Sequence, residues 1–300
     1  MTDIKVWTQW SDLKVPTGVT LLSAENFPLD TSDLTQVDFY VPVYMSGAKG
    51  LSYVSKMSNL KTLQMPNAGY EDALAHLRPG LTLCNSSGVH DASTAELAVG
   101  LAIASRRGFP EFMKDQNAGE WNHRRFPALS DSKVGIVGFG SIGKEIARKL
   151  SVFDVSITAF TQSGRDGSLT VDQLDKHLPH LDVVILILPL TDSSRHMFDA
   201  ARLSKMKDGS LLINMARGPV VVTDALVSEL NSRRIFAALD VTDPEPLPHG
   251  HALWSAPNLL LVPHVGGNSE AFEPRGRALV ESQLALLASG KPLEHVVAQG

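Results

Sequence analysis

Residues 134–143 read VGIVGFGSIG, an apolar run that leads directly into the pattern G-x-G-x-x-G. From within the pattern onward, Ile142, Ile146 and Leu150 recur at i, i+4 and i+8, which predicts a helix with one apolar face. A strand, a glycine turn and a helix in this order are typical of the first βα unit of a dinucleotide-binding fold.

The three glycines of this pattern have separate uses in such a turn. Gly138 permits a tight turn, Gly140 lets the backbone approach a pyrophosphate, and Gly143 lets helix and strand pack closely. The N-terminus of the helix then offers free amides and a positive dipole end to the phosphates. A glycine-rich turn without a ligand would carry the same residues, but the strands that follow favour a dinucleotide site.

Short apolar runs separated by helix-like stretches extend from this motif toward both ends of the chain. The run that contains the motif and five later runs predict a doubly wound parallel sheet, and five earlier runs predict a second parallel sheet. The predicted strands of the sheet that contains the motif are Val134–Val137, Val155–Phe160, Val183–Leu188, Ser210–Asn214, Phe236–Val241 and Leu259–Val262. The earlier strands are Ile4–Trp7, Val19–Leu22, Val37–Val41, Leu60–Gln64 and Leu81–Cys84.

The order of these runs predicts an α/β fold with two domains. We assign residues 98–264 to a Rossmann nucleotide-binding domain, inserted in a flavodoxin-like substrate domain formed by residues 1–97 and 265–300. A helix pattern over Ala278–Ala288 would return to the first domain and make it discontinuous.

The segment between the two series of strands has a different pattern. Ser93-Thr94-Ala95-Glu96 fits a capping box, in which Ser93 caps the free amides of a helix and Glu96 reaches back. The apolar stretch from Leu97 to about Ser105 then predicts a buried helix. Met113–Arg125 is polar, and we interpret it as a loop or an exposed arm.

Composition excludes several classes of protein. The 300 residues are 43% apolar and 20% charged, enough for a sizeable core and unlike a disordered chain. The net charge is -5 and no long basic run occurs, so we expect no nucleic-acid partner and no binding to anionic membranes. The most apolar run, Val183–Leu190, is too short for a membrane-spanning helix, which needs about 20 residues.

The sequence also bears on the cellular location of the protein and on whether it has a metal site. The start, MTDIKVWTQW, lacks the cationic lead and apolar core of a signal peptide. The single cysteine, Cys84, fits a reducing compartment, and we expect it to be a buried and inert thiol. We therefore expect a cytoplasmic protein, and we predict no metal site.

The loop after the second strand of the dinucleotide fold bears on the choice of cofactor. An NAD site places an acid about 20 residues beyond the glycines, where it accepts from the ribose 2′-hydroxyl. Thr161 stands eighteen residues after Gly143, and no acid occurs before Asp166. Thr161, Ser163 and Arg165 could instead hold a 2′-phosphate, which favours NADP over NAD. The alternative is a polar loop that distinguishes neither cofactor.

Three further segments follow strands of the second sheet: Asn214–Gly218, Leu239–Pro246 and Pro263–Gly267. With the glycine motif they make four ordered signatures, and over nearly its whole length the chain resembles the D-isomer-specific 2-hydroxyacid dehydrogenases. The resemblance implies transfer of a hydride from NAD(P)H to a 2-keto acid, giving a D-2-hydroxy acid. It also implies that Arg217 binds substrate, that Glu245 orients a histidine, and that His264 is the acid/base.

Physical chemistry is compatible with each of these roles. Arg217 offers a fork of donors for a carboxylate and a carbonyl, and His264 can donate a proton to the developing alkoxide. Glu245 on the other ring nitrogen would hold the tautomer and favour the imidazolium. Any one of the three could be an ordinary surface or loop residue, as we interpret His249 and His251, but their joint occurrence behind a nucleotide fold favours catalysis.

The resemblance implies lesser roles as well. Ala68 and Gly69, within Asn67-Ala68-Gly69-Tyr70, resemble the loop whose amides hold the substrate carboxylate. The segment near residues 98–130 would form a homodimer. The implied cofactor contacts beyond the three glycines and the 2′-phosphate loop are Ser141, Ile142, Leu188, Pro189, Ser194, Met215, Ala216 and Asp240.

Two alternatives to this enzyme remain open. A dinucleotide-sensing corepressor would keep the nucleotide site and bind partners without significant turnover. Formate oxidation is disfavoured, because that subgroup pairs its histidine with glutamine where this chain has Glu245. The identity of the 2-keto acid is not fixed, although we expect the loop Tyr44-Met45-Ser46 to meet its side chain. The chain length predicts no C-terminal regulatory domain.

Overall fold

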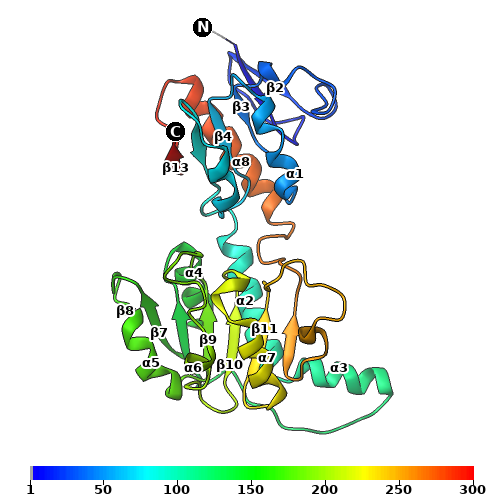
Figure 1. The fold of residues 1–300 in the computed structure, drawn as a ribbon, viewed down its shortest axis with the longest axis vertical. Helices are drawn as coiled ribbons and strands as arrows, with labels where there is room; N and C mark the ends of the chain where they lie inside the picture. Colours follow the sequence, from blue (N-terminus) through cyan, green and yellow to red (C-terminus); the bar gives the residue numbers. More distant parts are fainter. Residues whose placement is uncertain (1–2) are drawn as a thin grey trace. The chain divides into compact units, whose positions relative to one another are not determined.

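The computed structural model describes residues 3–300, and the chain divides into two compact units (Figure 1). Unit 1 comprises the chain up to His90 together with Glu270–Gly300, and unit 2 is Asp91–Ser269. The domain boundaries expected from the sequence, 97/98 and 264/265, stand seven and five residues from the changeovers at 90/91 and 269/270.

Unit 2 is built on a seven-stranded sheet in which every pair of neighbouring strands is parallel. Its order is β12-β11-β10-β9-β6-β7-β8, the doubly wound arrangement. The strands after β6 are added first toward the edge at β8 and then, from β9 on the other side of β6, toward the edge at β12. All six predicted strands are confirmed, with ends displaced by one or two residues, and the two-residue β8 was missed. The strands are β6 (Lys133–Val137), β7 (Ser156–Thr161), β8 (Leu169–Thr170), β9 (Val183–Leu186), β10 (Leu211–Asn214), β11 (Phe236–Leu239) and β12 (Leu259–Leu261).

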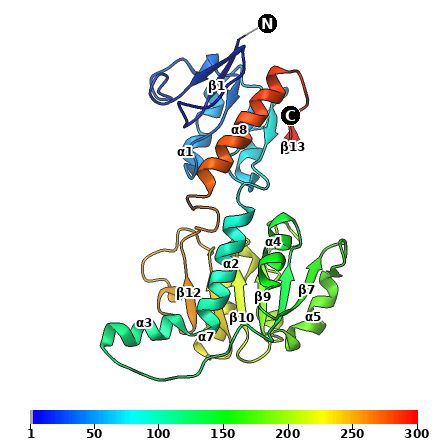
Figure 2. The same cartoon turned by 180° about the vertical axis from the view of Figure 1, so that it is seen from behind.

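Helices cover both faces of this sheet, so its central strands are apolar on both sides (Figures 1 and 2). Val183 and Ile185 of β9 pack in one cluster with α2 and α4, while Val184 and Leu186 pack in the other cluster with α5, α6 and α7. Each such buried side chain contributes about 1.5–3 kcal/mol of hydrophobic stabilisation. The helices are α2 (Asp91–Arg106), α4 (Ser141–Leu150), α5 (Leu174–His177), α6 (Ala200–Leu203) and α7 (Thr223–Asn231).

The predicted start of α2 is wrong. The helix begins at Asp91, so Ser93 lies inside its first turn, and the Ser93 hydroxyl donates to the carbonyl of Gly266 at 2.8 Å. The capping-box pattern therefore does not mark the start of this helix, because the serine hydroxyl bonds a distant acceptor.

The polar segment that follows contains a helix, α3 (Phe109–Ala118), where the sequence indicated a loop or an exposed arm. Left-handed glycines flank it, Gly108 at φ 67° and Gly119 at φ 71°, and none of its residues is buried. Figures 1 and 2 show α3 and the chain that follows projecting away from the sheet of unit 2. We call residues 109–128 the arm.

Unit 1 has a six-stranded sheet of order β13-β5-β4-β3-β1-β2. The five predicted strands are confirmed and form the flavodoxin-like order 2-1-3-4-5. An antiparallel edge strand, β13, was missed, since its alternation is too short to separate from a loop. The strands are β1 (Ile4–Trp7), β2 (Val19–Leu22), β3 (Phe39–Tyr40), β4 (Thr62–Gln64), β5 (Thr82–Cys84) and β13 (Val296–Gln299).

The C-terminal helix α8 (Phe272–Ala288) belongs to unit 1, as its predicted return to the first domain requires. Phe272, Val280 and Leu284 of α8 pack on the face of the sheet that carries Val6, and Trp7 lies in the core of the opposite face. The remaining helices are α1 (Gly47–Leu51), η1 (Leu34–Gln36), η2 (Val54–Lys56), η3 (Glu71–His76), η4 (Val171–Gln173), η5 (Leu178–His180), η6 (Gly218–Val220) and η7 (Ala252–Ser255).

The single cysteine lies in β5, in the core of unit 1. Cys84 is fully buried, as predicted, and burial raises the pKa of its thiol to about 11. No helix within residues 3–300 combines the length and the apolar character needed to cross a bilayer.

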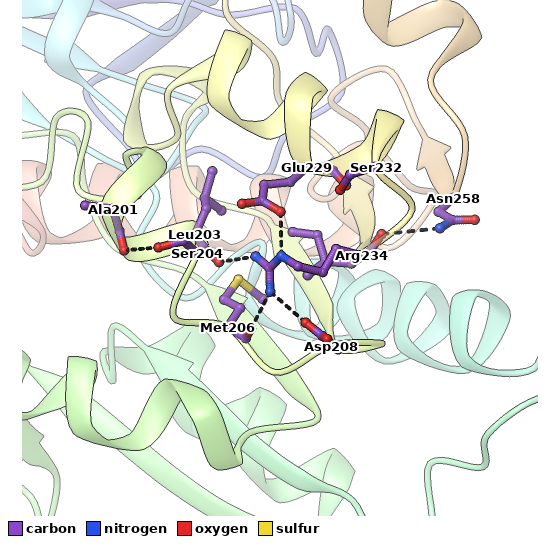
Figure 3. Close-up of polar contacts among 10 residues, drawn as sticks. Ala201, Leu203, Ser204, Met206, Asp208, Glu229, Ser232, Arg234 and Asn258 are labelled. Carbon is purple, nitrogen blue, oxygen red and sulfur yellow. Dashed lines mark hydrogen bonds and ion pairs between the residues drawn. The ribbon is translucent and has the colours of Figure 1, made fainter.

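Arg234 fastens the turn before β11 to its surroundings (Figure 3). Its guanidinium bonds the Glu229 carboxylate at 2.6 Å and the carbonyls of Leu203 and Met206, each at 2.6 Å. It also reaches Asp208 at 3.2 Å. This one side chain therefore ties α7 and the segment after α6 to the turn that leads into β11, on the side of unit 2 where β11 begins.

Candidate active site

The glycine turn after β6 has the close approaches that its sequence predicts. Gly138 has φ 102°, and a Cβ there would lie 2.1 Å from the Ile187 carbonyl oxygen. A Cβ on Gly143 would lie 2.3 Å from the Gly138 carbonyl oxygen. A Cβ on Gly140 would meet nothing within 4 Å, so packing within the protein does not require glycine there. The space beside Gly140 is open to a ligand, which fits a pyrophosphate.

The first turn of α4 fits the same group. Gly140 precedes the helix and provides no side-chain cap. Within residues 3–300 the amides of Ser141, Ile142 and Gly143 have no acceptor. These amides, at the positive end of a ten-residue helix, are suited to bind phosphate oxygens.

The loop after β7 is closed by its own hydroxyls. Thr161 is buried; its Oγ1 lies 2.7 Å from Ser168 Oγ and accepts the Gly164 amide at 3.0 Å. Thr161 therefore shapes the loop, and its hydroxyl is already engaged where the sequence suggested a direct contact with the cofactor. Ser163 and Arg165 are exposed at the surface of the loop.

The acid of this loop is paired with α4. Lys144 Nζ lies 2.8 Å from Asp166 Oδ2, and this contact lowers the pKa of the Asp166 carboxyl. Arg165 adds a weaker electrostatic contribution and makes no ion pair or side-chain hydrogen bond within the described chain. The loop thus exposes the Arg165 cation, while the neighbouring Asp166 carboxylate is already paired with Lys144.

The loop after β9 is likewise internally bonded. Ser194 is buried, and its hydroxyl donates to the Pro189 carbonyl and accepts the Thr191 amide, both at 2.8 Å. Leu188 is half-buried in the core, and its amide nitrogen stands 3.0 Å from where a Cβ of Gly138 would lie. Ser194 therefore fixes the shape of the loop beside the glycine turn.

Asn214, at the end of β10, braces the turn that carries Arg217, a role that the sequence did not assign to it. Its amide nitrogen donates to the Arg217 carbonyl and its amide oxygen accepts from Ala216 N, each at 3.0 Å. The Met215 amide is bonded to Leu186 at 3.0 Å. The amides of Met215 and Ala216 are therefore engaged, and the Ala216 carbonyl accepts from Arg217 Nη1 at 2.8 Å.

The turns after β10 and β11 are packed together. A Cβ on Gly218 would lie 1.9 Å from the Thr242 carbonyl oxygen, so only glycine allows this approach. Thr242 in turn donates from its hydroxyl to the Pro244 carbonyl at 2.8 Å. Close packing at Gly218 thereby brings the segment that carries Arg217 beside the segment that carries Glu245.

His264 and Glu245 form the predicted pair. His264 Nδ1 lies 2.5 Å from Glu245 Oε1, and their side chains are 42% and 40% exposed. Engagement of Nδ1 leaves Nε2 as the ring atom that can carry a proton to or from a ligand. The backbone of His264 is left-handed, with φ 52°.

Asp240, at the end of β11, is 3% exposed, and its two carboxylate oxygens accept the amides of Val265 at 2.6 Å and Gly266 at 3.1 Å. Burial raises the pKa of the Asp240 carboxyl, against the lowering effect of these two amides. The resemblance placed this aspartate near the nicotinamide amide. Its carboxylate also holds the loop that carries His264, and the contact with the nicotinamide stays a prediction.

The loop after β4, in unit 1, is the one whose amides are predicted to hold the substrate carboxylate. Asn85 donates from its side chain to the Ala68 carbonyl at 2.7 Å, and the Ser86 amide donates to the Asn67 carbonyl at 2.9 Å. The amides of Ala68 and Gly69 have no acceptor within residues 3–300. These two amides are suited to hold a carboxylate.

The loop expected to meet the substrate side chain, Tyr44-Met45-Ser46, follows β3 in unit 1. The Tyr44 ring stacks on Phe272 with 3.8 Å between ring centroids, while Met45 is 53% exposed. In residues 3–300 no three His, Cys, Asp or Glu side chains gather as they would around a metal ion.

Comparison with known proteins finds relatives over most of the chain. Residues 99–266 match the family described as D-isomer specific 2-hydroxyacid dehydrogenase, NAD binding domain. A glyoxylate reductase from Thermofilum pendens is 34% identical over an alignment of 248 positions that covers 78% of this chain and 73% of the relative.

Solved structures agree with this match. An NADPH-dependent glyoxylate/hydroxypyruvate reductase from Sinorhizobium meliloti, in complex with NADP and sulfate, is 26% identical with a TM-score of 0.82, covering 98% of both chains. A D-isomer specific 2-hydroxyacid dehydrogenase family protein from Aeromonas salmonicida has a TM-score of 0.88 at 24% identity, covering 99% of each chain, and supports the fold.

Proposed function

This chain belongs to the D-isomer specific 2-hydroxyacid dehydrogenase family, and we propose that it reduces a small 2-keto acid such as glyoxylate or hydroxypyruvate with NADPH. As an oxidoreductase of this family it transfers a hydride from NAD(P)H to a 2-keto acid, giving a D-2-hydroxy acid, and it can run in reverse. The relatives named as reductases and dehydrogenases favour this enzyme over a binding scaffold without turnover.

The pair His264–Glu245 carries the proposal for the chemistry. Reduction adds a hydride to the carbonyl carbon, which the bound dinucleotide supplies, and a proton to the carbonyl oxygen. His264 donates that proton from Nε2, because Nδ1 is held by Glu245 at 2.5 Å. The Glu245 carboxylate stabilises the imidazolium before the transfer, and afterwards it holds the neutral ring with its proton on Nδ1, so that Nε2 can take up a proton again.

Arg217 and the loop after β4 are the proposed substrate-binding groups. Asn214 braces the Arg217 turn from both sides, which gives the guanidinium a fixed base from which to bind the keto acid. The Ala68 and Gly69 amides are proposed to donate to the substrate carboxylate, and Asn85 supports their loop through the Ala68 carbonyl.

The residues proposed to hold the dinucleotide are the glycine turn, the first turn of α4 and the loops after β7, β9, β10 and β11. The preference for NADPH rests on one observation: the Asp166 carboxylate is paired with Lys144 at 2.8 Å, and Arg165 beside it is exposed. A ribose 2′-phosphate would meet the exposed Arg165 cation there, because the charges of Asp166 and Lys144 offset each other. NADP in the Sinorhizobium meliloti reductase is consistent with this choice.

The test is a panel of 2-keto acids assayed with both cofactors. We expect turnover with NADPH to exceed turnover with NADH in kcat/KM, and glyoxylate or hydroxypyruvate to exceed pyruvate and larger keto acids. A clear preference for NADH would overturn the cofactor assignment. Tight NADPH binding with no turnover on any keto acid would favour the dinucleotide-sensing scaffold.

We also propose that the enzyme is a homodimer formed through the arm, in the cytoplasm. Trp121 is 97% and Met113 62% exposed, and such side chains gathered on one projection are typical of an interface. Phe112 packs edge-on against Phe126, so the arm has a folded shape to offer. Light scattering should give twice the chain mass of 32.4 kDa, and Trp121→Glu should give the monomer. A monomeric wild type would exclude the dimer.

A further inference from the structure

The loop after β12 holds His264 in a backbone conformation that needs support. With φ 52°, His264 lies in the left-handed region, which residues other than glycine adopt uncommonly, although asparagine, aspartate and histidine do so more often than the rest. Such a conformation persists where the surrounding structure holds it, and residues of this kind occur at active sites. The contacts of the next two residues show what holds it.

One support comes from Asp240. Three consecutive amides end on this residue: His264 N on its carbonyl at 2.7 Å, Val265 N on Oδ1 at 2.6 Å, and Gly266 N on Oδ2 at 3.1 Å. Successive amides that converge on one anion form a backbone nest, and here the anion is a buried side chain of the protein itself.

The second support comes from α2. The Ser93 hydroxyl donates to the Gly266 carbonyl at 2.8 Å, and Ser269 Oγ lies 2.7 Å from the same hydroxyl. Gly266 is closely surrounded, because a Cβ there would lie 2.8 Å from Asp240 and 3.3 Å from Thr94. The Gly266 residue is therefore bonded at its amide by Asp240 and at its carbonyl by Ser93.

We propose that Ser93 is a positioning residue for the proton donor: with Asp240 it clamps Gly266 from opposite sides and so fixes the left-handed His264 and the direction of its Nε2. This inference rests on the proposed role of His264. Ser93 touches neither the ring nor Glu245, so its removal leaves the 2.5 Å pair intact and changes where the pair stands. Misplacement by about 1 Å can cost about a hundredfold in rate.

The test compares Ser93→Ala with Ser204→Ala, whose hydroxyl donates to the Ala201 carbonyl at 2.9 Å in α6, outside the proposed site. In Ser93→Ala we expect kcat for keto-acid reduction to fall about tenfold and the solvent deuterium isotope effect on kcat to rise, because proton transfer becomes slower. The Kd of NADPH should not change. Ser93→Thr, which keeps the hydroxyl, should restore kcat to within about twofold, and Ser204→Ala should match wild type.

Separate outcomes identify which idea fails. If His264→Ala retains near-normal kcat, the proposed function fails and this inference fails with it. If His264→Ala is inactive while folded Ser93→Ala keeps wild-type kcat and isotope effect, only the inference is overturned. If Ser93→Ala does not fold, Ser93→Cys takes its place, since a thiol of similar size is a weak donor and should show the same loss.

Discussion

Two loops of unit 2 differ in what holds them. The loop after β12, residues 263–267, receives its bonds from distant parts of the unit: Asp240 on β11 and Ser93 on α2. The loop after β7, residues 161–168, closes on itself through Thr161 and Ser168, and an ion pair joins it to α4. The first loop carries the proposed proton donor and the second the proposed cofactor-selecting cation.

The difference indicates that the positioning of the proton donor and the selection of the cofactor depend on separate loops. A proton donor must stand within hydrogen-bond reach of its target, so its loop is fixed from several sides. A phosphate-binding arginine needs only an exposed charge on a stable turn, and its loop can change without disturbing the rest of the unit. Substitutions in the two loops should therefore affect different kinetic constants.

The largest effect is expected at His264. His264→Ala removes the proton donor, and loss of a general acid costs about 10²–10⁴ in rate. We expect kcat for reduction to fall by that factor while the Kd of NADPH, measured by fluorescence quenching, changes less than twofold. His251→Ala is the control, because its ring accepts the Leu253 amide in a separate loop. Near-normal turnover of His264→Ala would contradict the mechanism.

The next effect is expected in the other loop. Arg165→Ala should remove a charge-assisted contact to the 2′-phosphate, about 1.5–3 kcal/mol or about 10–150-fold in kcat/KM for NADPH. Values for NADH should stay the same, because NADH has no phosphate there. Arg148→Ala, which breaks an exposed pair with Glu145 on α4, should leave both cofactors unaffected. Equal losses with both cofactors would show that Arg165 does not read the phosphate.

A smaller effect, in kcat, is expected at Glu245. Glu245→Gln keeps the shape but replaces a charge-assisted hydrogen bond to His264 Nδ1 with a neutral one, which is about half as strong. The ring is then held less firmly for proton donation, so kcat for keto-acid reduction should fall about tenfold while the Kd of NADPH stays the same. Arg165→Ala, assayed at saturating NADPH, should keep wild-type kcat. A wild-type kcat in Glu245→Gln would remove the carboxylate from the mechanism.

The smallest effect is the coupling between the cofactor loop and the pair His264–Glu245. If the two are independent, the effects of Arg165→Ala and Glu245→Gln on kcat/KM should add, with a coupling energy within about 0.5 kcal/mol in a double-mutant cycle. A larger value of either sign would show that the cofactor loop and the catalytic pair communicate. Measured with NADH, the same cycle should show no effect of Arg165 at all.

The sequence alone was sufficient for the features that depend on neighbouring residues. The glycine turn, the strand series and the motifs around Arg217, Glu245 and His264 are local patterns, so they could be predicted before any contact was known. The pairing of His264 with Glu245 came from the family resemblance and is confirmed at 2.5 Å. The preference for NADPH and the site roles stay predictions.

The tertiary structure decided what the short hydroxyls and the buried acid bind. Ser93 fits a local cap, yet its partner lies 173 residues away at Gly266; Thr161 is expected to face a cofactor, yet it closes its own loop. Serine, threonine and aspartate can bond local or distant backbone groups at similar energy, so the sequence does not choose between them. The choice is made when α2, β11 and the loop after β12 pack together and bring Ser93, Asp240 and Gly266 into contact.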